Sequence, residues 1–145
     1  MNWQTVAKDR LKEYKGRITA IECIKEQIEM LENSFTSIRS ATTDSIAVSD
    51  NTNRRENMLI NNIATRDGLK HNLKVAKTEV KITEKGLMCL TPEEKRILEL
   101  FYIERHSDYI ERLCDELFIS KSELYRRKDE ALKKFTRACY GIVEL

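Results

Sequence analysis

The sequence contains very little proline and glycine, with one Pro and four Gly among 145 residues. Folds made of many short strands depend on these residues for their tight turns, so such folds are disfavoured. Lys, Glu, Leu and Arg are abundant instead, and each of them favours a helix. We therefore expect an all-α protein. A chain of this length fits one domain, or a small domain with an elongated oligomerisation element.

Long apolar runs are also missing. The N-terminal segment MNWQTVAKDRLKEYKG has no apolar core of the signal-peptide type. No stretch of about 18 apolar residues occurs anywhere in the chain, so no transmembrane helix is expected. These absences predict a cytoplasmic protein without a membrane partner.

Metal-ligand spacing and catalytic motifs are absent as well. No CxxC pair occurs, and the few Cys and His residues lie far apart along the chain. They are Cys23, His71, Cys89, His106, Cys114 and Cys139. There is also no Gly-rich phosphate loop, no G-x-S-x-G elbow and no H-E-x-x-H motif. We expect reduced, mostly packed thiols, no metal, no cofactor and no enzymatic activity.

Two apolar seams with near-heptad spacing are present in the first 88 residues, which we expect to form a helical oligomerisation region. The first seam comprises Ala7, Leu11, Tyr14, Ile18, Ile21, Ile24, Ile28 and Leu31, and the second Leu59, Ile63, Leu69, Leu73, Ala76, Val80 and Leu87. The Ser/Thr-rich segment 33–52 between them predicts a loop. The two helices could pair with each other as a hairpin or with copies in another subunit, and we favour a homo-oligomer.

Capping signals divide the C-terminal region, residues 89–145, into three shorter helices. Gly86 is a candidate C-cap for the second long helix, and Thr91-Pro92-Glu93-Glu94 predicts a capping box that opens the next helix. A second short helix begins at Ser107 or Asp108. The third begins at Ser120, with Glu123 three positions further on.

Charge is distributed unevenly over this region. Residues 121–137 carry seven Lys or Arg against three Asp or Glu, whereas residues 91–116 carry four against eight. Two short helices joined by a tight turn, the second one rich in exposed cations, form the pattern of a helix-turn-helix DNA reader. We therefore expect double-stranded DNA as a partner.

The segment from Leu90 to Phe135 resembles the fourth, promoter-reading domain of bacterial sigma factors. Leu90, Thr91, Arg96 and Leu98 match the opening of that pattern. Leu117, Ile119 and Ser120 match its turn, except that Phe118 stands in place of the usual glycine. This exchange predicts either backbone strain or an altered turn. This domain near the C-terminus, together with the ending ALKKFTRACYGIVEL, resembles the ArpU/RinA group of phage late-gene regulators. That resemblance implies activation of late or packaging genes in the cytoplasm of a bacterial host, with RNA polymerase as a partner.

The resemblance also assigns DNA-contacting residues. On the third helix they are Ser120, Lys121, Ser122, Tyr125, Arg126, Arg127 and Lys134, and Ser107 at the start of the preceding helix joins them as a phosphate contact. Arg126 is the first candidate for a base contact, because a guanidinium can bind guanine bidentately. Lys121 and Lys134 are better suited to phosphates. Tyr125 could contact a thymine methyl or sugar, or simply pack within the protein.

These features predict a sequence-specific regulator in which the long helices hold reader helices at a fixed separation. Two alternatives remain open at this point. The chain could be a coiled-coil interaction protein that engages RNA polymerase without reading DNA. It could also be the small subunit of a phage DNA-packaging machine.

Overall fold

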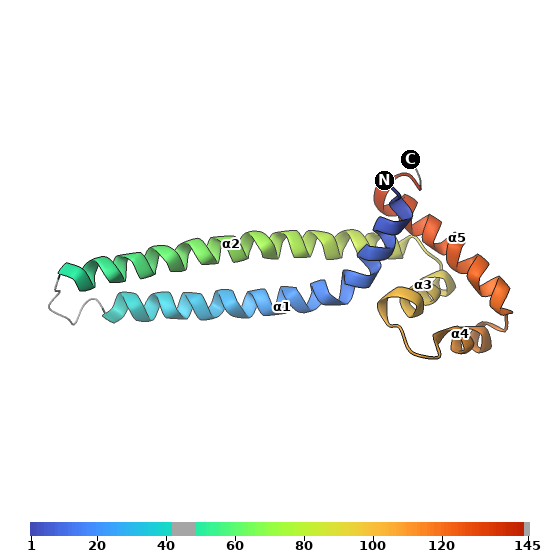
Figure 1. Cartoon of the computed structure of the whole chain (residues 1–145), viewed down its shortest axis with the longest axis horizontal. Coiled ribbons are helices and arrows are strands. Elements are labelled where there is room, and N and C mark those ends of the chain that lie inside the picture. The colour runs from blue at the N-terminus through green and yellow to red at the C-terminus, as the bar shows by residue number, and fades with distance from the viewer. Residues whose placement is uncertain (42–48, 144–145) are drawn as a thin grey trace. The chain divides into compact units, whose positions relative to one another are not determined.

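The computed structural model describes residues 1–41 and 49–143, and all regular structure within them is helical. The elements are α1 (Trp3–Ala41), α2 (Ser49–Met88), α3 (Pro92–Leu98), a π-helical turn η1 (Glu99–Ile103), α4 (Tyr109–Leu117) and α5 (Lys121–Tyr140) (Figure 1). The expected all-α class is confirmed. None of the helices in the described part of the chain is both long and apolar enough to cross a membrane.

The chain forms two compact units, and the division differs from the boundary expected between residues 88 and 89. One unit contains Met1–Arg17 together with Thr78–Leu145, and the other contains Ile18–Lys77. The first unit includes one end of each long helix because Leu11 of α1 and Leu87 of α2 are buried in the same cluster as Leu132 and Phe135 of α5. These long-range apolar contacts, rather than the break at Thr91, set the division.

The unit Ile18–Lys77 is a helical hairpin, in which α1 and α2 of one chain pair with each other (Figure 1). Asn62 donates a hydrogen bond from Nδ2 to the carbonyl of Leu31 at 2.9 Å, and the Arg66 guanidinium lies 4.8 Å from the ring centre of Phe35. Asn62 is buried, whereas the predicted seam residue Ile63 is 43% exposed. At this point of the hairpin, the buried position of α2 is therefore occupied by Asn62 and not by the predicted seam residue.

The predicted loop over 33–52 is wrong for most of its length. Helix α1 continues to Ala41 and α2 already begins at Ser49, while residues 42–48 lie outside the described part of the chain. Hydroxyl groups bond back to the helix instead of breaking it: Thr36 donates to the carbonyl of Glu32, and Ser37 donates to that of Asn33, both at 3.1 Å. Such bonds to the residue four positions earlier make Ser and Thr compatible with a helix interior.

Gly86 does not end α2, contrary to the sequence-based expectation, because the helix continues to Met88. The glycine is buried where α2 passes close to α5. A β-carbon at this position would meet Cys139 Sγ at 2.5 Å and the Phe135 ring at 2.7 Å. Gly86 is thus required for close helix packing and not for a change of chain direction.

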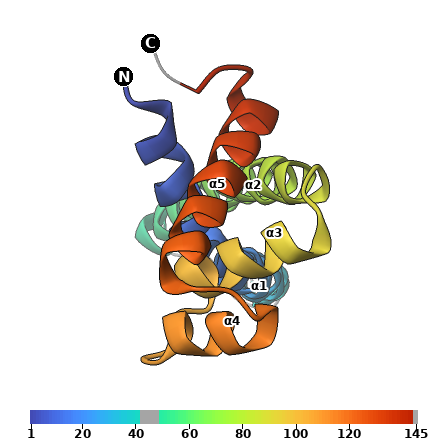
Figure 2. The ribbon, with the colours of Figure 1, turned by 90° about the vertical axis from the view of Figure 1, so that its right-hand side faces the viewer.

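The unit that contains the C-terminal helices has two apolar clusters. The cluster already described joins the two long helices to α5. The second is formed by Ile97, Leu100, Phe101, Leu113 and Leu124, from α3, η1, α4 and α5. The second cluster fixes the positions of α3 and α4 against the N-terminal half of α5, which carries the predicted DNA-contacting residues (Figure 2).

Candidate nucleic-acid interface

Helices α4 and α5 are joined by a turn of three residues, as the sequence predicts. Helix α4 ends at Leu117, and the backbone N–H groups of Phe118 and Ile119 both donate to the carbonyl of Cys114. Ser120 is the N-cap of α5, and its hydroxyl accepts the N–H of Glu123 at 3.2 Å. The first turn of α5 is therefore fixed in position at the end of a short, hydrogen-bonded connection.

Phe118 has the left-handed backbone conformation, with φ 55° and ψ 44°. Among the described residues, Phe118 is the one non-glycine residue with a positive φ. Its side chain is 94% exposed. The turn thus keeps the geometry for which glycine is suited, and the phenylalanine bears the steric strain. This outcome confirms the first of the two alternatives predicted for the exchange.

Helix α5 has a buried side and an exposed side. The buried side is formed by Leu124, Ala131, Leu132, Phe135 and Thr136. The opposite side, which we call the outward stripe of α5, consists of exposed residues at spacings of three or four: Ser122, Arg126, Asp129, Lys133 and Arg137. Three of these five residues are cationic, so the outward stripe can face a polyanion without exposing the core.

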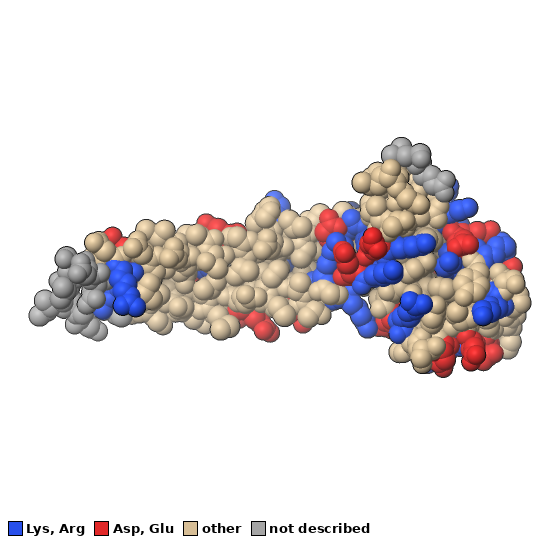
Figure 3. All heavy atoms as spheres, viewed as in Figure 1, with Lys and Arg blue, Asp and Glu red and all other residues tan. Residues whose placement is uncertain are grey.

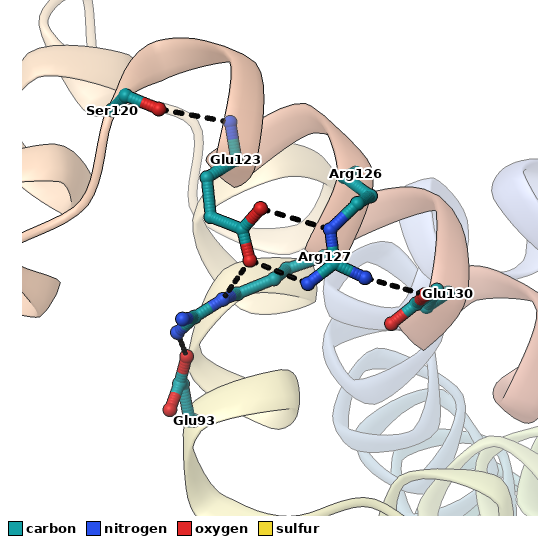
Figure 4. Close-up of polar contacts among 6 residues, drawn as sticks. All are labelled: Glu93, Ser120, Glu123, Arg126, Arg127 and Glu130. Carbon is teal, nitrogen blue, oxygen red and sulfur yellow. Dashed lines mark hydrogen bonds and ion pairs between the residues drawn. The ribbon is translucent and has the colours of Figure 1, made fainter.

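Arg126 is exposed as predicted, but its guanidinium is bound to two carboxylates of its own helix (Figure 4). Its Nε donates to Glu123 at 2.8 Å, and a terminal nitrogen donates to Glu130 at 2.7 Å. These bonds raise the pKa of Arg126, with Glu123 as the main cause. A base or a phosphate would have to compete with these carboxylates for the guanidinium.

Arg127 lies deeper and connects α5 to α3. Its Nε donates to Glu123 at 3.0 Å, and its other end pairs with Glu93 (Figure 4). Hydrogen bonds from Arg126 and Arg127 lower the pKa of Glu123 to about 2. Glu123 therefore does not complete a capping box with Ser120, because its carboxylate is occupied by the two arginines.

Lys134 also reaches across to α3. Its ammonium lies 3.0 Å from Oε1 of Glu94, the carboxylate that completes the capping box at Thr91. The acidic segment 91–116 and the basic segment 121–137 thus neutralise each other where they meet. Figure 3 agrees, since Lys and Arg alternate with Asp and Glu on the face shown. The local excess of positive charge is smaller than the sequence suggested.

Ser107 and Lys121 both line a shallow hollow between α4 and the start of α5. Besides these two residues, its lining consists of Asp108, Tyr109, Ile110, Glu111, Cys114 and Asp115. Three carboxylates and one ammonium line this hollow, so its composition favours a phosphate less than the outward stripe does. Lys121 and Ser122 are nevertheless exposed on the first turn of α5, beside the N-terminal backbone groups that attract anions.

The Tyr125 ring packs against other side chains of the protein. Its ring meets that of Phe101 edge to face with 5.9 Å between centroids, and the Lys128 ammonium lies 5.6 Å from the Tyr125 ring centre. The side chain is still 37% exposed. The packing alternative therefore describes most of the Tyr125 side chain, and one edge of it stays accessible next to Ser122.

The predicted DNA contacts did not include two cations of the outward stripe, Lys133 and Arg137, although helical spacing already indicated Lys133 on the outward side of the helix. Both are exposed on the outward stripe, and neither forms an ion pair with another residue in the described part of the chain. Their spacing of seven and eleven residues from Arg126 places them on its side of the helix. That spacing was the signal that could have identified both residues as members of the site.

Within the described residues, no group of three or more His, Cys, Asp or Glu side chains is arranged to hold a metal ion. His71 and His106 are both exposed. No family model, curated protein or solved structure matches the chain. The function must therefore be argued from the geometry of the chain itself.

Proposed function

We propose that this protein is a DNA-binding transcription regulator of the ArpU/RinA phage type, which reads duplex DNA with the outward stripe of α5. The observation that carries the proposal is the position of that stripe. It follows a three-residue turn and a Ser-capped first turn, and it carries Arg126, Lys133 and Arg137 on the side opposite to the core. A helix presented in this way fits the major groove of B-DNA.

The roles of the side chains follow from their reach and their partners. Arg126 lies near the start of the helix, where side chains reach base edges, and its planar guanidinium suits guanine. Lys121, Lys133 and Arg137 have no ion-pair partner among the described residues, so they can bind phosphates without first breaking a bond. Arg127 and Lys134 hold α3 against α5, and we assign them to positioning the reader helix.

The bound regulator activates transcription, in this proposal, by contacting RNA polymerase in the cytoplasm of a bacterial host. A homo-oligomer places two or more reader helices on one site, so that the symmetry of the site matches that of the protein. The resemblance to sigma factors and to ArpU/RinA regulators supports this part.

The experiment that tests the proposal selects bound duplexes from a random pool at roughly physiological salt. The wild-type protein is compared with a Lys121→Ala, Arg126→Ala variant. The matched control is Lys12→Ala, Lys95→Ala, which removes two exposed cations from α1 and α3 instead. We expect the wild type and the control to enrich one motif that the α5 variant does not enrich.

Absence of enrichment by the folded wild type would contradict the proposal. Loss of binding in both variants alike would show that total charge, and not the outward stripe, carries the affinity. Circular dichroism of each variant establishes that the helices are intact.

A second candidate is an interaction protein that engages RNA polymerase without reading DNA. The observation in its favour is the pairing of Arg126, Arg127 and Lys134 with carboxylates, because a neutralised surface suits a protein partner better than a polyanion. In that case, we expect the immobilised wild-type protein to retain RNA polymerase, and added duplex DNA should not displace the polymerase from it. The DNA-packaging subunit is distinguished by mass, since it would form a ring of many copies.

A further inference from the structure

Phe118 combines two unfavourable features at one position. Its left-handed backbone conformation is strained for most residues with a β-carbon, with Asn and Asp as the exceptions, and its aromatic ring is 94% exposed to water. A glycine would relieve the strain and remove the exposed ring. Strained residues that a fold retains at the edge of a binding site are often kept for function.

The backbone of Phe118 is fixed by hydrogen bonds, although its ring is exposed to water. The N–H groups of Phe118 and Ile119 are both held by the carbonyl of Cys114, Ile119 is half-buried, and Ser120 caps α5. The ring is thus presented by a rigid turn, three residues before the first residue of the helix that carries the outward stripe. Because the backbone is already fixed, binding of the ring costs only the rotamer freedom of one aromatic side chain.

The other aromatic side chains near the start of α5 pack within the protein. Tyr125 packs against Phe101, and Tyr109 meets the same ring edge to face with 5.0 Å between centroids. Phe118 is therefore the side chain at this end of α5 that offers an unengaged apolar surface. In the major groove, the apolar group that distinguishes one base from the others is the thymine C5-methyl.

We propose that Phe118 contacts a thymine methyl at the edge of the DNA site and so helps to determine which sequence is read. This inference rests on the proposed function, because it requires the N-terminal end of α5 to lie in the major groove. It adds an apolar contact to a surface otherwise made of charged and polar groups. It also accounts for a residue whose backbone conformation favours glycine.

The test uses the duplex that the full-length wild-type protein selects from a random pool. Each thymine of this duplex is replaced in turn by deoxyuridine, which removes only the C5-methyl. Binding is measured for the wild type, for Phe118→Gly and for Phe118→Asn, two variants that tolerate the left-handed conformation.

We expect one deoxyuridine position to weaken wild-type binding about fourfold, the effect of removing one buried methyl group. The same replacement should leave the affinity of the two variants unchanged, since they have no ring to contact the methyl. Both variants should bind the unmodified duplex more weakly than the wild type. Their melting temperatures should be no lower, because the backbone strain is relieved in each.

Equal affinity of Phe118→Gly and wild type for the selected duplex would overturn this inference and leave the reader helix in place. A deoxyuridine effect of equal size in the wild type and both variants would assign the methyl contact to another side chain, and would also overturn it. If the wild type selects no duplex, the proposed function itself fails, and the inference fails with it.

Discussion

Gly86 is the position at which a single methyl group should be most damaging. A β-carbon there would approach Cys139 Sγ to 2.5 Å and the buried Phe135 ring to 2.7 Å. The ring has little space to move, since Phe135 of α5 is fully buried in a cluster with residues of α1, α2 and α3. We expect Gly86→Ala to lower the free energy of unfolding by about 2 kcal/mol, as measured by urea denaturation.

Gly16→Ala is the matched control for this prediction. Gly16 also lies inside a long helix, but nothing comes within 4 Å of the position of its β-carbon. Alanine should therefore stabilise the protein by up to about 1 kcal/mol through its higher helix propensity. Destabilisation by both substitutions would show that helix flexibility, and not close packing, accounts for the glycines.

Glu123 should make stability depend on pH in the acid range. Hydrogen bonds from Arg126 and Arg127 lower its pKa from the usual 4.5 to about 2 in the folded protein. Between these two values the unfolded chain binds more protons than the folded one, so stability falls as pH falls through this window. We expect a steeper loss of melting temperature between pH 4.5 and 2 in the wild type than in Glu123→Gln.

Glu111→Gln is the control for the pH series, because Glu111 is exposed and makes no ion pair within the described part of the chain. This variant should keep the wild-type slope. Identical slopes in the wild type and Glu123→Gln would show that the two arginines do not bind Glu123 in solution.

At the scale of the element, the balance of charge on α5 determines how strongly it can bind a polyanion. Glu130 holds one end of the Arg126 guanidinium, so Glu130→Gln both removes a negative charge and frees that end, while Glu123 still binds the guanidinium through Nε. We expect this variant to bind the selected duplex more tightly than the wild type. The reason is that the Arg126 guanidinium then has one carboxylate fewer to compete with a guanine for its hydrogen bonds.

Asp129→Asn separates these two effects. Asp129 lies on the same outward stripe and pairs with Lys128 at 2.9 Å, so the substitution removes an equal charge without releasing Arg126. A smaller gain in affinity than that of Glu130→Gln is expected, as measured by fluorescence anisotropy at two salt concentrations. Equal gains would show that simple repulsion from phosphate, and not competition for Arg126, limits the affinity.

Local sequence signals located the C-terminal elements well. The capping box at Thr91 and the cap at Ser120 involve residues three positions apart, so the sequence contains all that these features require. The Ser/Thr-rich segment was misleading because the hydroxyls of Thr36 and Ser37 bond within α1. Composition alone does not show whether such side chains break a helix or bond back to it.

The candidate interface was less predictable because its charge balance depends on contacts between distant residues. Arg127 and Glu93 are 34 positions apart, and Lys134 and Glu94 are 40 apart. Counting charges by segment therefore overestimated the positive field at α5. The strain at Phe118 was predictable, since it follows from one side chain at a position of known backbone geometry.

At the scale of the whole molecule, the hairpin Ile18–Lys77 buries few side chains among its described residues. Among the described residues of this unit, Ile28 and Asn62 are the two that are buried. Its seam residues Ile21, Ile24, Leu69 and Leu73 are only partly covered. A pair of helices with so few buried side chains gains too little from apolar burial to be stable by itself. Association with another copy would cover the seams.

The exposed apolar residues of α2 indicate where such association can be tested. Ile60 is 62% exposed and Ile63 is 43% exposed, three positions apart on one side of the helix. We expect the wild type to sediment with at least twice the mass of one chain, and to melt at a temperature that rises with concentration. Ile60→Lys, Ile63→Lys should shift the mass toward one chain and lower the melting temperature. Met88→Lys, at an exposed residue outside the hairpin, should change neither. A wild type that sediments as one chain at every concentration would show that the hairpin is stable alone, and avidity would then no longer contribute to the proposed DNA binding.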